Sequence, residues 1–149
     1  MWEQCVVDEG SVRNLCRRWT VPGEAAADAF ACGDWASLGG WWMDGGGLST
    51  HECWWFRLEV SRWDLKGWVD IKGRMQDDIA FFECLAQVVL LGLRAQRGGC
   101  GRGVVHQGCD NQTTVGALRK KLSTCDPLAT AVQAMAGWEA GADVEVREL

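Results

Sequence analysis

The sequence lacks several features that would assign the chain to a common class. It has no tyrosine and only two prolines beside ten tryptophans. We interpret this as a coding bias, because no physical requirement excludes tyrosine so completely. Internal repeats and low-complexity tracts are absent. No apolar run is both long enough and free enough of polar residues to cross a bilayer, so no membrane association is expected.

The cysteines favour a reduced, intracellular protein. Their even number of eight would predict a disulfide framework in a small secreted chain. Residues 1–10, however, have neither a basic segment nor a continuous apolar run, so no secretory signal is visible. No CxxC pair occurs, and Cys100, His106 and Cys109 match zinc motifs poorly. We expect an intracellular protein, in cytoplasm or nucleus and not secreted; the alternative is a Trp-rich, disulfide-linked extracellular binding protein.

Length and charge set further bounds. A chain of 149 residues suits one domain with a single core, and 48% apolar with 23% charged residues is a globular balance. The net charge of −5 argues weakly against nucleic-acid binding through bulk electrostatics. A carboxylate cluster neutralised by metal is still compatible with such binding. Basic residues also group locally, as at 119–121, where a solvated face and a phosphate contact are both open interpretations.

The first part of the chain predicts a β-meander after an irregular start. Residues 1–24 form a lead-in with some helical pattern, which ends at the Val21-Pro22-Gly23 break. Short apolar runs follow at 25–31, 35–43 and 51–65, separated by turn residues. Two strands joined by a tight turn and followed by a third predict an antiparallel meander.

The second part alternates between helix and strand. Residues 75–97 have helical spacing and are apolar almost all round, apart from Glu83 and Gln87, which predicts a buried central helix. A strand at 104–109, helices at 113–122 and 126–140, and a strand at 144–149 follow. The last helix is expected to begin with Asp126 as N-cap and Pro127 at its first position. This order predicts an α/β domain over 25–149, with helices packed on a mixed five-stranded sheet.

Three acidic residues stand where burial is costly. Asp28 interrupts an apolar strand, Glu83 lies on the most apolar helix, and Asp110 follows the fourth strand at its carboxyl end. Carboxylates repel one another unless a cation lies between them, and such ligands suit Mg²⁺ or Mn²⁺. The alternatives are that Asp28 and Asp110 each cap a turn and that Glu83 reaches solvent at the edge of the helices.

These residues resemble a known family, the ribonuclease H-like domain that follows the polymerase in retroelement reverse transcriptases. The matching features are an Asp-Ala strand start (28–31), a Gly-Gly aromatic pair (38–42), a Glu-x-Leu-Ala helix (78–87), an Asp-Asn strand end (109–112), the helix behind it (117–120), the next helix start (126–128) and a last strand (144–149). The resemblance covers residues 25–149 and implies an antiparallel meander of strands 1–3 followed by parallel strands 4 and 5.

The resemblance also implies a function. Asp28, Glu83 and Asp110 would hold two divalent ions, Mg²⁺ or Mn²⁺, that cleave the RNA strand of an RNA–DNA hybrid. Asp34, in the hairpin turn, is the alternative first ligand. Hybrid or other nucleic acid would be bound through backbone contacts, and an upstream polymerase domain is a further expected partner. The implied nucleic-acid contacts are Gly39, Gly40, Asn111, Arg119 and Lys120, although a tight bend and a solvated helix face explain glycines and basic residues equally well.

One departure from the family concerns the C-terminus. The family has a fourth acidic ligand on a helix after the fifth strand, whereas this sequence stops at Leu149 with that strand. We therefore expect a C-terminally truncated domain that lacks the final helix. This leaves a second hypothesis open, a catalytically inactive ribonuclease H-like module that binds nucleic acid or a protein.

Overall fold

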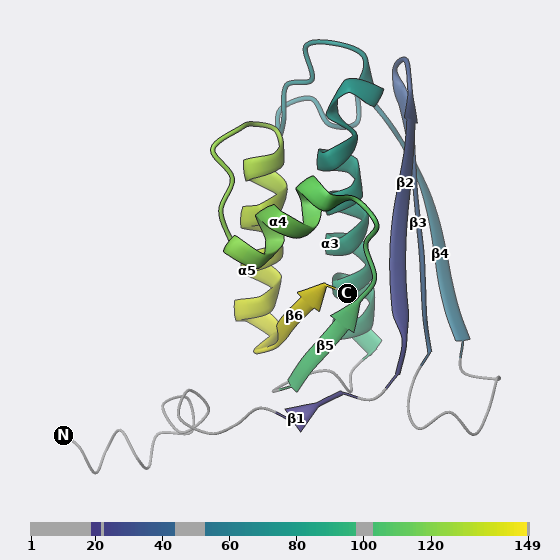
Figure 1. Ribbon diagram of the computed structural model, residues 1–149. Helices are drawn as coiled ribbons and strands as arrows, with labels where there is room; N and C mark the ends of the chain where they lie inside the picture. The colour runs from purple at the N-terminus through teal and green to yellow at the C-terminus, as the bar shows by residue number, and fades with distance from the viewer. Residues whose placement is uncertain (1–18, 22, 44–52, 98–102, 149) are drawn as a thin grey trace.

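The computed structural model describes residues 19–21, 23–43, 53–97 and 103–148 (Figure 1). In chain order its elements are β1 (Trp19–Thr20), β2 (Ala25–Cys32), β3 (Trp35–Met43), β4 (Cys53–Ser61), the 3₁₀ helix η2 (Met75–Asp78), α3 (Ile79–Arg97), β5 (Gly103–Gln107), α4 (Gln112–Lys120), α5 (Leu128–Ala142) and β6 (Glu145–Glu148). From β2 onward this is the predicted order of strands and helices. None of the described helices is long and apolar enough to cross a membrane.

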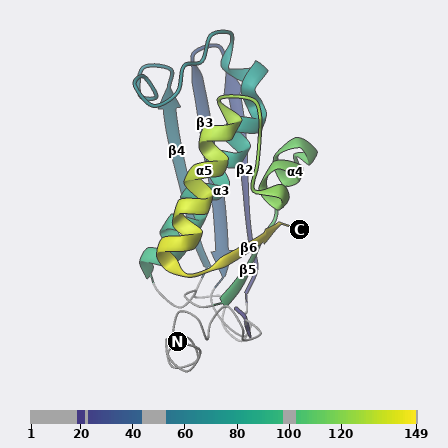
Figure 2. The ribbon, with the colours of Figure 1, turned by 90° about the vertical axis from the view of Figure 1, so that its left-hand side faces the viewer.

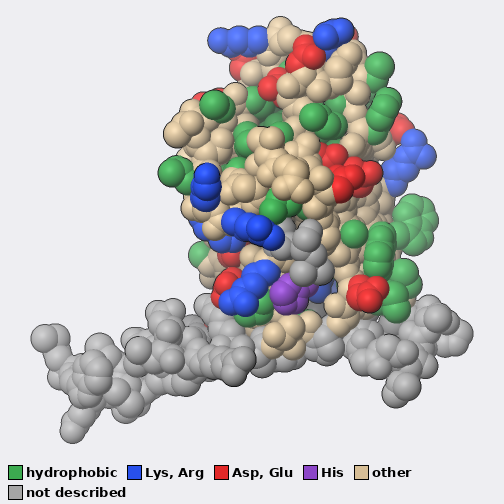
Figure 3. Space-filling view, in the orientation of Figure 1, with side chains coloured by type: hydrophobic (Ala, Val, Ile, Leu, Met, Phe, Trp, Pro, Cys, Tyr) green, Lys and Arg blue, Asp and Glu red, His purple; other side chains and the backbone are tan. Residues whose placement is uncertain are grey.

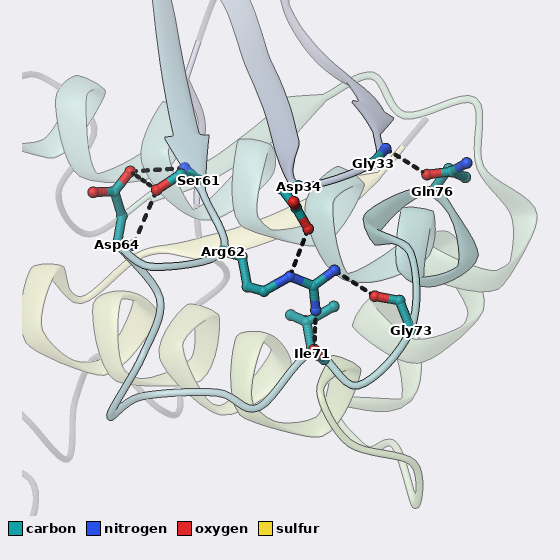
Figure 4. A network of polar contacts seen from close by, with 8 residues as sticks. All are labelled: Gly33, Asp34, Ser61, Arg62, Asp64, Ile71, Gly73 and Gln76. Atoms are coloured by element: carbon teal, nitrogen blue, oxygen red, sulfur yellow. Dashed lines mark hydrogen bonds and ion pairs between the residues drawn. The ribbon is translucent and has the colours of Figure 1, made fainter.

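Strands β2, β3 and β4 form the predicted antiparallel meander. The turn between β2 and β3 has two residues, since Cys32 pairs with Trp35. Gly33 occupies this turn with a φ of +61°, a conformation that favours glycine in tight hairpins. Its N–H donates to the Gln76 side chain of η2 at 2.8 Å, which ties the hairpin to the start of the helical layer (Figure 4).

The helices cover one face of the meander, and no described helix covers the other (Figures 1 and 2). Helix α3 packs on β2 and β3, and α5 packs on α3. Alternation along the strands explains the two faces, because successive side chains point to opposite sides. Trp42 is accordingly buried against the helices while Trp41 is exposed, and Trp55 is exposed while Trp54 is half-buried.

A second, parallel set of strands continues the sheet. Strand β5 pairs in parallel with β6, and its first residues pair with β1. In the part of the chain that the structure describes, one parallel bridge, between Ala26 and Gly108, joins this set to β2. The predicted mixed sheet is therefore confirmed, and its two parts meet through a narrower junction than a full ladder. The helical pattern predicted in the lead-in lies outside the described residues except at Trp19, which is in strand β1.

Strand β4 ends earlier than predicted, at Ser61 instead of residue 65. The Asp64 carboxylate accepts hydrogen bonds from the Ser61 N–H at 2.7 Å and from its hydroxyl at 2.9 Å (Figure 4). A short acidic side chain that bonds the backbone in this way offers an alternative to the strand ladder. The chain therefore turns at Ser61 although apolar residues continue beyond it.

The predicted cap of the last helix is wrong. Helix α5 begins at Leu128, the N-cap position is Pro127, and no side chain caps it. The Asp126 carboxylate accepts instead from the Thr130 hydroxyl at 3.5 Å. The first N–H groups of the helix bond backbone carbonyls instead, since the Ala129 N–H donates to Cys125 at 2.9 Å and the Thr130 N–H to Pro127 at 3.1 Å.

Candidate metal centre

The three predicted carboxylates meet at one place although they come from three different elements. Asp28 lies in the middle of β2, Glu83 in the second turn of α3, and Asp110 just after β5. One carboxylate oxygen from each lies within 4.8 Å of the other two. Asp28 and Asp110 are exposed, whereas Glu83 is buried.

The β2–β5 junction explains why the two aspartates are neighbours. Ala26 and Gly108 face each other across the parallel bridge, and each aspartate lies two residues further along the chain, Asp28 within β2 and Asp110 just beyond β5. This equal offset from the bridge brings the two aspartates alongside each other, and their carboxylate oxygens lie within 4.8 Å. Gly108 allows the close approach, since a Cβ there would lie 3.3 Å from the Cβ of Ala26.

Glu83 is a buried acid whose partners are the other two. Its side chain is 4% exposed, and its Oε2 has no hydrogen-bond partner among the described residues. The pKa of the Glu83 carboxyl is raised from 4.5 to about 8, mainly by burial and then by the hydrogen bond and charge of Asp28. The charge of Asp110 acts in the same direction, while the backbone N–H of Ala29 opposes them. The alternative that Glu83 reaches solvent is therefore wrong.

Neither aspartate has the turn-capping role considered as an alternative. Asp28 lies inside β2, where its Oδ1 accepts from the N–H of Ala29 at 2.8 Å. Helix α4 is capped by Asn111, whose side-chain oxygen accepts from the Thr114 N–H at 3.0 Å. Asp110 therefore precedes the capping residue and projects its carboxylate at the junction.

A cavity of about 470 Å³ opens beside these carboxylates. Its walls include Asp28, Asp110, Gly39, Gly40 and Trp41. Gly39 pairs with Asp28 across the β2–β3 ladder, so the floor of the cavity next to this carboxylate has no side chain. A ligand can therefore approach the backbone of β3 directly beside Asp28.

The two glycines of β3 differ in what surrounds them. A Cβ at Gly40 would lie 2.5 Å from the Phe56 ring and 3.0 Å from the Ala26 carbonyl oxygen. A Cβ at Gly39 would meet only the Phe56 carbonyl oxygen, at 3.7 Å. Gly40 is therefore required by packing, while the open side of Gly39 faces the cavity.

Two predicted contact residues lie away from the carboxylates. Arg119 and Lys120 are in the last turn of α4. A rise of 1.5 Å per residue puts that turn about 13 Å along the helix from Asn111. On the face drawn in Figure 3, Asp and Glu side chains gather near the strands, with Lys and Arg side chains beside them and over the helices. The structure thus brings Gly39, Gly40 and Asn111 close to the carboxylates, and not these two basic residues.

Asp34, the alternative first ligand, is at the far end of β2. Its Oδ1 accepts from Arg62 Nε at 2.8 Å, and the same guanidinium donates to the carbonyls of Ile71 and Gly73 (Figure 4). At about 3.3 Å per residue, six positions of strand separate it from Asp28 by roughly 20 Å. Of these two aspartates, the structure brings Asp28 to Glu83 and Asp110.

Two buried glutamines lie next to the centre, and neither was predicted from the sequence to belong to the site. Gln87 and Gln107 have no exposed surface, and they are hydrogen-bonded to each other. Gln87 interrupts an apolar helix as Glu83 does, which was the available signal. Gln107 lies in a strand too short for its alternation to predict which side chain is buried.

The donor set fits a hard divalent cation. Such ions take oxygen ligands from carboxylates, and three carboxylates converge here. The buried Glu83 Oε2, which lacks a partner among the described residues, is an oxygen that a cation would satisfy. All three side chains would be ligands, Asp28 and Asp110 from the exposed side and Glu83 from the buried side.

Comparison with solved structures identifies the fold. Ribonuclease H1 from the halophilic archaeon Halobacterium salinarum NRC-1 superposes with a TM-score of 0.56 at 17% identity, over 85% of this chain and 84% of that one. LC11 ribonuclease H1, solved in complex with an RNA/DNA hybrid, gives a TM-score of 0.53 at 11% identity, over 86% and 85%. The chain therefore has a ribonuclease H-like fold, as its sequence predicted.

The remaining comparisons add less. No protein-family model and no curated protein sequence matches this chain. Prototype foamy virus protease–reverse transcriptase superposes with a TM-score of 0.49 at 11% identity, over 91% of this chain and 18% of that one. This likeness is too weak to support an origin in a reverse transcriptase, which stays a prediction from sequence resemblance.

Proposed function

We propose that this chain is a metal-dependent nuclease domain that cleaves the RNA strand of RNA–DNA hybrids. The observation that carries the proposal is the convergence of Asp28, Glu83 and Asp110 beside an open cavity, with one buried carboxylate oxygen unpartnered among the described residues. The likeness in fold to a ribonuclease H1 bound to an RNA/DNA hybrid supports this choice of substrate.

In this proposal each acid has a distinct part. Asp28 and Asp110, being exposed, hold Mg²⁺ or Mn²⁺ on the side that substrate reaches, and Glu83 completes the ligand set from beneath. Bound divalent ions supply an activated water and neutralise the charge that develops on the phosphodiester. Without a cation Glu83 keeps its proton near neutral pH, because burial disfavours its charged form. Metal binding therefore releases a proton from this site.

The cavity supplies the contacts with substrate. Gly39 lets the RNA backbone approach β3 beside Asp28. Asn111, which follows Asp110 outside the cavity wall and caps α4, can donate from its amide group to a phosphate or ribose oxygen. Arg119 and Lys120 then contact phosphates further along the duplex. A retroelement parent protein with an upstream polymerase domain, and an intracellular location, remain predictions that rest on the sequence alone.

The test is cleavage of an end-labelled RNA–DNA hybrid in Mg²⁺ or Mn²⁺. We expect metal-dependent cutting of the RNA strand, with the DNA strand and double-stranded DNA uncut. Glu83→Gln should abolish cutting, whereas Asp34→Asn, which removes an acid from the other end of the same strand, should leave it intact. A folded protein that binds hybrid without cutting it would support the inactive binding module. A folded protein that neither binds nor cuts hybrid would refute the proposal.

A further inference from the structure

The two strands that carry the aspartates are joined by few backbone bonds. The Gly108 N–H donates to the Ala25 carbonyl at 2.8 Å, and the Ala27 N–H donates to the Gly108 carbonyl at 3.2 Å. Among the described residues this bridge is the whole ladder between β2 and β5. The separation of Asp28 from Asp110 therefore depends on a junction that backbone pairing alone holds weakly.

Gln87 spans this junction from the helix above it. It lies one turn after Glu83 on α3 and has no exposed surface. Its side-chain Nε2 donates to the Gly108 carbonyl at 2.8 Å and to the Ala27 carbonyl at 3.2 Å. One amide group thus bonds both Ala27, which precedes Asp28, and Gly108, which lies two residues before Asp110.

A chain of donors sets the orientation of this amide. Arg94 can only donate, and its Nη1 donates to Gln107 Oε1 at 3.4 Å. The Gln107 Nε2 therefore faces the opposite way and donates to Gln87 Oε1 at 3.0 Å. This leaves the Gln87 NH₂ group directed at the two strand carbonyls. A guanidinium thus specifies which end of Gln87 meets the junction.

We infer that Gln87 is a positioning residue that holds Asp28 and Asp110 at the separation metal binding requires. This role rests on the proposed nuclease function. Gln87 would support that function without touching metal or substrate. A buried amide on an apolar helix is costly unless it is hydrogen-bonded, and here its bonds go to the two strands bearing the ligands. Ligand groups must be held within about 0.5 Å of their working geometry, which a weakly paired junction would not ensure.

The test compares Gln87→Met with Leu91→Ala. Methionine keeps the length and volume of glutamine but has no donor, and Leu91 is an equally buried residue one turn further along α3. Amide hydrogen exchange is measured at Ala27 and Gly108. Mn²⁺ affinity is measured by calorimetry, and the rate of hybrid cleavage is measured as a function of metal concentration. If Gln87→Met does not fold, Gln87→Asn, whose amide is one methylene shorter, takes its place.

We expect Gln87→Met to lose exchange protection at Ala27 and Gly108 beyond any global destabilisation. Its Mn²⁺ affinity should fall roughly 10- to 100-fold, the range typical of residues that support metal ligands, and cleavage should need correspondingly more metal. Leu91→Ala should lose protection uniformly and keep its metal affinity.

Each of the other results would overturn the inference. Unchanged protection at the two amides would mean that Gln87 does not hold the junction. Lost protection with unaltered Mn²⁺ affinity would mean that the junction does not set the ligand geometry. A wild-type protein that neither binds Mn²⁺ nor cleaves hybrid would refute the proposed function as well. The wild-type measurement therefore distinguishes failure of the proposed function from failure of the inference about Gln87.

Discussion

The Glu83 carboxylate on α3 lies within 4.8 Å of the Asp28 carboxylate on β2, although one is buried and the other exposed. Two acids this close favour a shared proton or a shared cation, because two bare negative charges repel. The site therefore destabilises the folded chain when no cation is bound and stabilises it when a cation is bound.

In the absence of metal, the free energy of unfolding should fall as pH rises from about 5 to 8. The pKa of Glu83 is about 8 in the folded chain against 4.5 ordinarily. Between these two pH values the folded state therefore keeps a proton that the unfolded state releases. The stability that this bound proton contributes is fully present below pH 4.5 and is lost as pH rises through 8. The slope contributed is at most about 1.4 kcal/mol per pH unit. Urea unfolding with chelator at several pH values measures it, and Glu83→Gln should remove this component. Parallel curves for the two proteins would contradict the prediction.

Divalent cations should stabilise the folded chain through the same three acids. A cation that binds only the folded state adds about 2.7 kcal/mol at 100 times its dissociation constant. Melting temperature measured against Mn²⁺ concentration should therefore rise for the wild type and stay flat for Asp110→Asn. Asp34→Asn serves as the control, since its carboxylate is paired with Arg62 and should not contribute. An equal loss of the metal effect in both variants would count against the site.

The two glycines of β3 should differ when changed to alanine. Gly40→Ala places a Cβ 2.5 Å from the Phe56 ring, so overpacking should cost about 1–3 kcal/mol in urea unfolding. Gly39→Ala has no contact closer than 3.7 Å and should keep its stability, but its methyl group enters the cavity beside Asp28. We expect a higher KM for hybrid in Gly39→Ala. A KM equal to that of the wild type would show that substrate does not approach this strand.

Two substitutions of Asn111 should separate its capping role from its proposed contact with nucleic acid. Asn111→Ala removes the acceptor of the Thr114 N–H and should cost about 1 kcal/mol of stability. Asn111→Asp keeps a capping oxygen but loses the amide donors and adds charge beside Asp110, so stability should hold while KM for hybrid rises. Stability is measured by thermal unfolding, and KM for hybrid is measured at saturating metal. An unchanged KM in Asn111→Asp would restrict Asn111 to the cap.

Much of the fold could be predicted because it depends on periodicity along the chain. The apolar pattern of 75–97 predicted the central helix, and the turn residues at 32–34 predicted the hairpin that Gly33 makes. Asp28, Glu83 and Asp110 were identifiable for a related reason, since each is charged where its neighbours indicate burial. The pattern could not show whether Asp28 or Asp34 lies beside Glu83 and Asp110, because Asp28 interrupts the strand that Asp34 follows.

The errors concern contacts that local sequence does not specify. Asp126 has the residue type of a helix cap, yet its oxygen accepts from Thr130. Ser61 lies in an apolar run, yet Asp64 ends the strand there. Short polar side chains have several partners within reach, and the surrounding chain decides among them.

The sequence by itself determined which segments become strands and helices and which acids are expensive to bury, because both follow from the spacing of apolar residues. Only the tertiary structure decided that, within the described ranges, β2 and β5 meet through one bridge at Gly108 and that Gln87 spans it. It also decided that Arg119 and Lys120 lie a helix length from Asp110. These are relations between residues distant in the chain, and they depend on how strands and helices pack against one another, which spacing along one segment does not encode.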